Sequence, residues 1–217
     1  QSVYRAFAAK GFFFKEGYGL TEAGPNNFFL HPDDAPQKRG SVGKPMMFNK
    51  VKIVDDTGAE LAAGQPGELL LQGNHLFDRY WNNPAATDQA LSGGWLRTGD
   101  YAIRDEDGCY YIVGRKKDMI ITGGENVYPK EVELVIEKLA FVDEVAVIGL
   151  PDEIWGEAVT AVVVLQPGAH LTYEELKAHC LKHLAKYKIP KRLMIVDEIP
   201  KNAIGKTDKK RLAEQFS

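Results

Sequence analysis

The sequence predicts a mixed α+β fold with a β-rich first part and a smaller α+β second part, in which helices flank a sheet. Up to Gly114, short apolar segments alternate with turn sequences, which is typical of a mainly β structure. These segments are residues 51–54, 68–72 and 109–113. Beyond Gly114, strand patterns alternate with helix patterns. The change falls in the sequence GRKKD, so we expect one domain at residues 1–114 and another at residues 115–217.

Local signals predict the elements of the first part. Apolar residues before Gly11 predict a short helix that ends there, and the aromatic run at residues 12–14 predicts a strand. A further strand is expected to end near LRTGD, residues 96–100. One helix is clear, because Asn83 can cap its N-terminus and Pro84 stands at the first helical position, where a missing N–H has no consequence.

The second part has stronger periodicity. Pro129 opens a helix with apolar residues at three- and four-residue steps, which predicts one buried face. Those residues are Val132, Val135, Ile136 and Leu139. Two strands follow, at residues 145–149 and 158–165, and a capping box of Thr172 and Glu175 starts a helix that we expect to reach about Tyr187.

Pro190 stops that helix, and the chain should then form one more strand and one more helix. The strand is expected at residues 193–196 because of its apolar composition. The last helix should start near Thr207 or Asp208.

Composition excludes several classes of protein. The 217 residues are 44% hydrophobic and 26% charged, which excludes a disordered, collagen-like or coiled-coil chain. Apolar runs are too short for a membrane span. The formal net charge of −3 predicts no general attraction to nucleic acid. Two cysteines far apart in sequence, Cys109 and Cys180, form no disulfide framework, so we expect a reducing, cytoplasmic compartment.

One region departs from this overall balance. Residues 182–211 contain ten basic and three acidic side chains. Such an excess can meet a phosphorylated ligand, or it can be a solvated basic surface with no ligand at all.

Two motifs in the first part carry groups suited to a nucleotide. In GYGLTE, residues 17–22, Gly17 and Gly19 permit a close backbone approach, and Tyr18 offers a ring face. Thr21 and Glu22 add a hydroxyl and a hard oxygen of the kind that magnesium prefers. In LRTGD, Asp100 can accept hydrogen bonds from both hydroxyls of a ribose, although each motif can also be an ordinary turn.

Two further motifs lie in the second part. GRKKDMIITGGENVYP places the permanently charged Arg115 close to the domain junction and a Gly123–Gly124 pair on a loop. PKNAIGKT, residues 200–207, comes close to a phosphate-binding loop, but Pro200 stands where that loop requires glycine. We therefore expect a turn at Gly205 that presents Lys206, a flexible ammonium group. Taken alone, Arg115 and Lys206 would be ordinary surface cations.

Taken together, the motifs resemble the adenylate-forming enzyme superfamily, and most closely the acyl-CoA synthetases. The resemblance rests on GYGLTE, GELLLQG, RYWN, LRTGD, GRKKD, ITGGENVYP and PKNAIGK in this order and spans nearly the whole chain. It implies a carboxylic acid substrate, ATP, magnesium and coenzyme A. In that reaction the acid attacks the α-phosphate of ATP, and the thiol of coenzyme A then captures the acyl-adenylate.

For the first half-reaction, the resemblance implies roles for residues of several motifs. It implies that Tyr18, beside Gly19, stacks on adenine, that Thr21 contacts phosphate, and that Glu22 holds the metal. It further implies that Asp100 and Arg115 contact the ribose and that Lys206 stabilises the transition state, since charge grows on the phosphate oxygens.

For the second half-reaction, the resemblance implies a rotation of the small domain about a hinge at Lys117. Gly123 and Gly124 would then replace Lys206 and leave room for the pantetheine arm. Trp155, Tyr187 and Lys191 match positions that contact the coenzyme A nucleotide in relatives. For Trp155, packing in a core is an equal alternative.

The resemblance also implies that part of such an enzyme is missing. The Ser/Thr/Gly-rich phosphate loop and most of the acyl pocket precede GYGLTE in relatives, so we expect the C-terminal portion of a ligase. Residues 1–114 would be the tail of the large domain, and residues 115–217 the small mobile domain. We expect such a portion to be inactive in the first step by itself. Fatty acids are the default substrate. Aryl acids, other adenylate-forming chemistry such as a luciferase-like oxidation, or mere binding of nucleotide or coenzyme A stay open.

Overall fold

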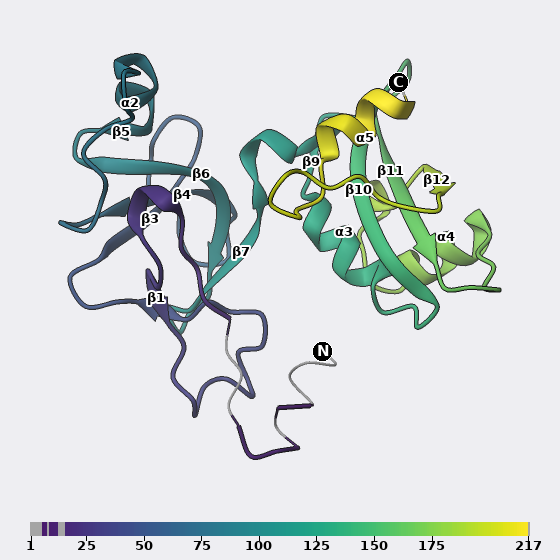
Figure 1. The fold of residues 1–217 in the computed structure, drawn as a ribbon, viewed down its shortest axis with the longest axis horizontal. Coiled ribbons are helices and arrows are strands. Elements are labelled where there is room, and N and C mark those ends of the chain that lie inside the picture. Colours follow the sequence, from purple (N-terminus) through teal and green to yellow (C-terminus); the bar gives the residue numbers. More distant parts are fainter. Residues whose placement is uncertain (1–5, 8, 13–15, 217) are drawn as a thin grey trace. The chain divides into compact units, whose positions relative to one another are not determined.

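The computed structural model describes residues 6–7, 9–12 and 16–216, and Figure 1 shows their fold. The chain divides into two compact units, Gln1–Val113 and Gly114–Ser217. This division lies one residue before the domain boundary expected from the sequence. The helix and strand expected before Gly11 and at residues 12–14 lie in part outside the described residues.

The first unit is built on an antiparallel sheet with the order β3-β4-β6-β5, and β7 pairs with β6. The strands are β3 (Lys50–Val54), β4 (Gly67–Gln72), β5 (Leu91–Ser92), β6 (Trp95–Arg104) and β7 (Tyr110–Arg115). Strands β1 (Phe28–Phe29) and β2 (Lys44–Pro45) form a separate antiparallel pair. The mainly β character predicted for this part is confirmed. LRTGD, however, lies inside β6 rather than at its end.

The helix predicted after Asn83 is confirmed as α2 (Pro84–Ala90). The Asn83 side chain accepts a hydrogen bond from the Ala86 backbone N–H at 3.1 Å, and Pro84 occupies the first helical position. A short 3₁₀ turn, η1 (Thr21–Ala23), forms within GYGLTE.

The second unit contains a sheet with the order β10-β11-β8-β9, and β12 runs parallel to β11. The strands are β8 (Ile120–Thr122), β9 (Glu125–Val127), β10 (Val142–Asp152), β11 (Gly156–Leu165) and β12 (Arg192–Ile195). The two strands predicted at 145–149 and 158–165 are confirmed, and they are longer than expected because they pair as one antiparallel hairpin. The β8–β9 hairpin forms where the sequence suggested only a loop.

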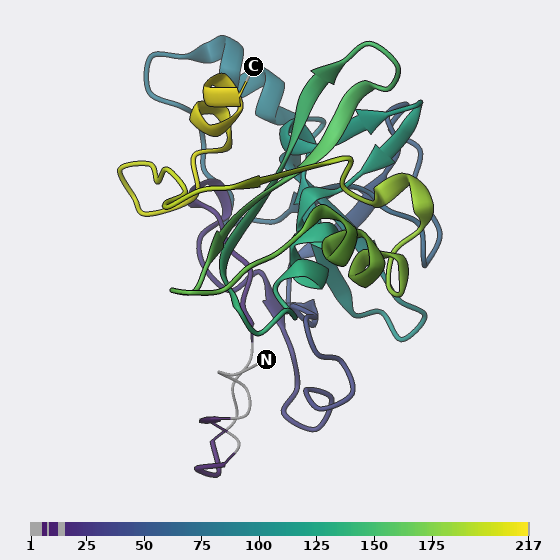
Figure 2. The same ribbon diagram turned by 90° about the vertical axis from the view of Figure 1, so that its right-hand side faces the viewer.

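The alternation of side chains along β10 and β11 creates a core on each face of this sheet. On one face lie Val147, Val159, Ala161 and Val163, packed with α3 (Pro129–Ile136) and α4 (Tyr173–Leu181). On the other lie Ala146, Ile148, Leu150 and Val162, packed with Leu212 of α5 (Lys209–Phe216). Figure 2 shows α4 and α5 on opposite sides of the strands. The predicted sheet flanked by helices is confirmed.

The predicted helix starts are confirmed at Pro129 and at the capping box of Thr172 and Glu175, whereas one predicted helix end is wrong. The helix expected to reach Tyr187 ends with α4 at Leu181. Ala185 has an extended backbone and redirects the chain into a 3₁₀ turn, η3 (Lys186–Lys188), after which Ile189 enters the core. Tertiary packing thus outweighs the local helix preference of this segment.

In the described part of the chain, every helix is too short or too polar to cross a lipid bilayer. Cys109 and Cys180 are both buried free thiols. Burial raises the pKa of the Cys180 thiol to about 11, so this group is un-ionised at neutral pH.

Candidate functional site

Tyr18 and Asp100 are 82 positions apart in sequence and meet in the first unit. The Tyr18 hydroxyl donates a hydrogen bond to Asp100 Oδ2 at 2.7 Å. Asp100 is buried in β6, where its backbone N–H donates to the Thr98 hydroxyl at 3.1 Å. The Tyr18 ring packs edge-on against Phe28, with 5.8 Å between ring centroids. These contacts fix the plane of the Tyr18 ring relative to a buried carboxylate.

The packing of the loop around Gly19 itself requires a glycine at this position. A Cβ atom at this position would lie 2.7 Å from the Gly24 carbonyl oxygen and 2.8 Å from Pro25 Cα, closer than real Cβ atoms come. Leu20 and Gly24 form an antiparallel bridge that closes the loop. The glycine therefore lets the loop pack on itself, independently of any ligand.

Glu22 is held by a tyrosine that the site prediction did not include. The Tyr80 hydroxyl donates to Glu22 Oε1 at 2.7 Å, and the Phe77 backbone N–H donates to the Glu22 carbonyl oxygen at 2.8 Å. Burial and then the Glu22 carboxylate raise the pKa of Tyr80 to about 12, so its hydroxyl stays a donor at neutral pH. Glu22 is half-buried, and Thr21 in the same 3₁₀ turn is exposed. The positioned Glu22 carboxylate is the kind of oxygen ligand that magnesium prefers, and the neighbouring residue Thr21 carries a hydroxyl that can bind phosphate.

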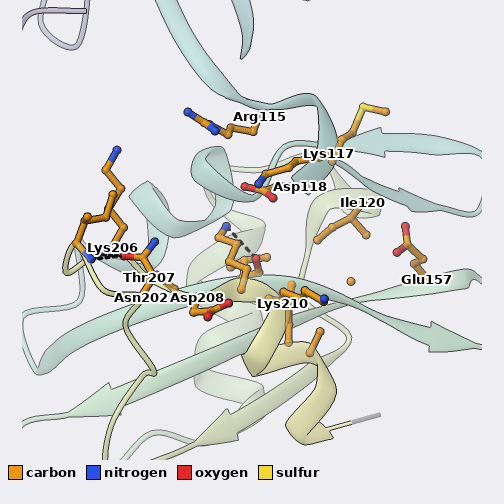
Figure 3. Close-up of a pocket in the computed structure, with 17 residues that line it drawn as sticks. Arg115, Lys117, Asp118, Ile120, Glu157, Asn202, Lys206, Thr207, Asp208 and Lys210 are labelled. Carbon is orange, nitrogen blue, oxygen red and sulfur yellow. Dashed lines mark hydrogen bonds between the residues drawn. The ribbon is translucent and has the colours of Figure 1, made fainter. Parts of the chain in front are cut away.

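In the second unit, Arg115, Lys117 and Lys206 line one cavity of about 810 Å³ (Figure 3). Arg115 ends β7, and Lys117 lies in the exposed 3₁₀ turn η2 (Lys116–Asp118). Figure 3 shows the Lys206 side chain extending away from the sheet. Among the described residues, no hydrogen bond or ion pair engages its ammonium group. The cavity thus offers an unpaired cation to a ligand.

Gly123 and Gly124 form the turn between β8 and β9, and both have left-handed backbone conformations, with φ of 60° and 83°. A Cβ on Gly123 would lie 3.1 Å from Cε3 of Trp155, whereas a Cβ on Gly124 would meet no atom within 4 Å. The Gly123 backbone N–H also donates to the Trp155 carbonyl oxygen at 2.8 Å. The turn geometry requires both glycines, but only Gly124 borders open space.

Lys191 lies against the same tryptophan. Its ammonium nitrogen is 4.5 Å from the Trp155 ring centroid and donates to Thr122 Oγ1 at 3.1 Å. Burial lowers the pKa of Lys191, although the Asp152 carboxylate acts in the opposite direction. Trp155 is 44% exposed, so it lies on the surface and is not packed in a core. Gly123, Trp155 and Lys191 therefore form one surface group.

Asp152 organises the turn that carries Trp155. Its Oδ1 accepts the backbone N–H groups of Ile154 and Trp155, each at 3.1 Å, and its Oδ2 accepts Arg192 Nη2 at 2.8 Å. The hydrogen bond from Trp155 is the largest of several interactions that lower the pKa of Asp152. The Asp152 carboxylate thus sets the backbone direction at Trp155.

Tyr187 is not joined to this group. In the part of the chain that the structure describes, no ring contact or hydrogen bond links Tyr187 to Trp155 or Lys191. Its ring instead contacts the ammonium of the adjacent Lys188, at 5.6 Å from the centroid. The structure therefore brings two of the three expected coenzyme A residues together.

The sequence analysis did not identify several residues that hold the candidate site residues in position. They are Tyr80, Thr122, Asp152 and Asn202. Tyr80 lies in RYWN, which was noted only for the resemblance. Asn202 lies three residues before Gly205, a spacing typical of a side-chain-stabilised turn. Asp152 carries a similar local signal, since its Oδ1 accepts N–H groups two and three residues further on. Thr122 carries none, because its partner Lys191 is 69 positions away in the sequence.

Two family models match the chain. The model described as "AMP-binding enzyme" matches residues 1–81, and the model described as "AMP-binding enzyme C-terminal domain" matches residues 131–206. The first range contains Tyr18 and Glu22, and the second contains Trp155 and Lys206.

Curated relatives and solved structures agree with these matches. A long-chain-fatty-acid–CoA ligase of Mycobacterium tuberculosis is 42% identical over 217 residues, which are 100% of this chain and 43% of the relative. A 2-succinylbenzoate–CoA ligase of Geobacillus is 42% identical over 91% of this chain and 40% of its own length. The structure of o-succinylbenzoate CoA synthetase from Bacillus subtilis with its acyl-adenylate intermediate has a TM-score of 0.90 at 35% identity, covering 97% of this chain and 43% of that chain. The same synthetase with ATP and magnesium ion has a TM-score of 0.88. The chain thus spans less than half the length of these relatives.

Replacing Gly123 with Ala should disturb Trp155, and Gly124→Ala is the matched control. Both variants place a Cβ at positive φ and should lose about 1–2 kcal/mol of unfolding free energy. Only Gly123→Ala brings its Cβ against the indole, so only it should shift the Trp155 emission maximum. The measurement is fluorescence in a background with Trp81→Phe and Trp95→Phe. Equal spectra for the two variants would contradict the described contact.

Proposed function

Because the chain belongs to the AMP-binding family of adenylate-forming enzymes, we propose that it is part of an ATP-dependent carboxylate–CoA ligase. The observation that carries this proposal is the Lys206 ammonium, which no described residue pairs with, in a cavity that Arg115 also lines. In the first half-reaction, a carboxylate oxygen bonds to the α-phosphorus of ATP and pyrophosphate leaves. In the second, the thiol sulfur of coenzyme A bonds to the acyl carbon and AMP leaves.

In this proposal, the first unit binds and orients the nucleotide. The Tyr18 ring, fixed by its hydrogen bond to Asp100, offers a face on which adenine stacks. The Asp100 carboxylate accepts hydrogen bonds from the ribose hydroxyls. Gly19 keeps the loop closed beneath the base. The Thr21 hydroxyl donates a hydrogen bond to a phosphate oxygen. Glu22, oriented by Tyr80, is the residue that would hold magnesium, which offsets negative charge on the phosphates when bound.

The second unit supplies positive charge at the reacting phosphate. Arg115 contacts the ribose, and Lys206 stabilises the charge that grows on the α-phosphate oxygens as the carboxylate attacks. A protein carboxylate paired with this ammonium would offset part of its positive charge and so weaken the stabilisation. The unpaired state of Lys206 among the described residues therefore supports its role.

The Gly123–Gly124 turn and the Trp155–Lys191 pair serve the second half-reaction in this proposal. The open space beside Gly124 leaves room for the pantetheine arm. The indole of Trp155 and the ammonium of Lys191 suit the adenine and phosphate of coenzyme A. Tyr187, which is exposed, would join this contact from η3. Lys117 is the hinge about which the small domain turns between the two half-reactions.

We further propose that the acid is a long-chain fatty acid, since the relative that covers the whole chain at 42% identity is a long-chain-fatty-acid–CoA ligase. An aromatic acid is the second candidate, which the similarity to the Bacillus subtilis and Geobacillus enzymes supports. A cytoplasmic location belongs to the same proposal, because both cysteines are free thiols.

The substrate proposal is tested by measuring acyl-CoA and AMP formation by the whole protein with hexadecanoate and with 2-succinylbenzoate. We expect kcat/KM to be at least about tenfold higher for hexadecanoate, because an apolar pocket gains binding energy from each methylene. A higher value for 2-succinylbenzoate would favour the aryl-acid alternative. Failure of both acids to yield AMP would contradict the ligase proposal for these substrate classes.

Lys206→Ala should suppress the first half-reaction selectively. We expect ATP–pyrophosphate exchange to fall by about 100-fold or more, since one stabilising charge is lost at the transition state. Thioester formation from presupplied acyl-adenylate should stay close to the unmodified rate. Lys177→Ala, which removes an exposed lysine from α4, is the control and should leave both rates unchanged. Equal losses in both half-reactions would contradict the assigned role.

Lys117→Pro should have the opposite effect. Proline fixes φ and restricts the preceding residue, so it should hinder the rotation that the second half-reaction needs. We expect slower thioester formation with exchange near its unmodified rate. Lys117→Ala removes the same side chain but keeps the backbone free, so it should alter neither rate. If Lys117→Pro left thioester formation intact, the hinge assignment would be wrong.

A further inference from the structure

The segment at residues 200–208, which we call the Lys206 loop, is closed by hydrogen bonds of its own backbone. The Asp208 N–H donates to the Pro200 carbonyl oxygen at 2.8 Å. Lys201 and Thr207 form an antiparallel bridge. Gly205 at the tip has a φ of 77°, which glycine adopts without strain. The loop is therefore a formed turn and not an extended tether.

Asn202 makes most of the contacts inside this turn. Its side-chain Oδ1 accepts the backbone N–H of Ile204 at 3.1 Å and that of Lys206 at 3.0 Å. Its own N–H donates to the Lys206 carbonyl oxygen at 2.7 Å, and its carbonyl oxygen accepts the Gly205 N–H at 2.9 Å. Both backbone polar groups of Lys206 are thus bonded to a single residue.

The lysines on either side of Lys206 are anchored through their side chains. Lys201 Nζ lies 2.5 Å from Glu144 Oε2. Lys209 Nζ lies 2.6 Å from Glu133 Oε1, a carboxylate that is almost completely buried. Lys206 has no such anchor in the described part of the chain. The ends of the loop are therefore held by ion pairs, while its tip is held by Asn202.

Apolar packing does not replace these hydrogen bonds. Ile204, the apolar side chain at the tip, is 75% exposed, and Asn202 and Gly205 are exposed as well. Burial of side chains therefore contributes little to the shape of the tip. The direction of the Lys206 backbone depends mainly on the four hydrogen bonds that involve Asn202.

We propose that Asn202 is a positioning residue for the adenylation half-reaction, which it serves by holding the backbone of Lys206. The proposal rests on the function proposed above for Lys206. Without the side-chain acceptor, the tip samples other turns, and the ammonium occupies its productive position for a smaller fraction of the time. Because Lys206 acts on charge that develops in the transition state, the loss falls on kcat more than on KM.

The test compares Asn202→Ala with Asn202→Asp in the whole protein. Asn202→Ala removes the acceptor of two hydrogen bonds, so kcat for ATP–pyrophosphate exchange should fall by about tenfold or more, with KM for ATP nearly unchanged. Asn202→Asp keeps an oxygen in place and should restore most of the rate. Thioester formation from presupplied acyl-adenylate should not change in either variant.

Asn83→Ala is the matched control. It also removes an exposed Asn oxygen that accepts a backbone N–H, in the cap of α2, and should leave exchange unchanged. A double variant, Asn202→Ala with Lys206→Ala, should exchange no more slowly than Lys206→Ala alone, since Asn202 acts only through Lys206.

Three results would overturn the inference. They are unchanged exchange in Asn202→Ala, equal losses in Asn202→Ala and Asn202→Asp, or a further tenfold loss when Asn202→Ala is added to Lys206→Ala. Failure of the proposed function is distinguishable, because Lys206→Ala itself would then retain exchange. If Lys206→Ala loses exchange and Asn202→Ala does not, only the positioning role fails.

Discussion

An ammonium group keeps its full positive charge for a phosphate when no protein carboxylate is paired with it, and its position must then come from bonds elsewhere in the residue. The second unit meets this constraint with the Lys206 loop. Lys201 and Lys209 are paired with Glu144 and Glu133, whereas Lys206 is held through its backbone by Asn202. In this way the charges that fix the loop are separate from the charge that the proposed reaction uses.

The sheet explains how the far end of the loop is fixed. Among the described strands, β10 lies at the edge of the sheet, so its outward N–H and C=O groups lack a neighbouring strand. At Val147, the Glu133–Lys209 ion pair takes the place of a neighbouring strand. Glu133 Oε1 accepts the Val147 N–H at 3.0 Å, and Lys209 Nζ donates to the Val147 carbonyl oxygen at 3.1 Å. Glu133 belongs to α3 and Lys209 to α5, which pack on opposite faces. One interaction therefore satisfies the strand edge and joins both helices to it.

The features that the sequence predicted well are those with local causes. The cap at Asn83 and the capping box at Thr172 need only neighbouring residues, and both were predicted correctly. The contact of Gly123 with Trp155 was not predicted, because it exists only where β8 meets β11 at Thr122 and Gly156. The early end of α4 has the same origin, since packing beyond the helix determines it. Sequence spacing therefore identified candidate residues, but not which of them touch.

The proposed hinge lies just before the sheet of the second unit begins. Lys117 lies in an exposed 3₁₀ turn, and only two residues separate it from β8. From Ile120 onward the backbone is hydrogen-bonded within the second unit, since β8 pairs with β9 and the Ile121 N–H donates to Glu157 Oε2 at 2.7 Å. A rotation placed further along the chain would break these bonds, whereas one at Lys117 leaves them intact. The Gly123–Gly124 turn and the Lys206 loop belong to the body that begins at β8, so a rotation at Lys117 would move both together.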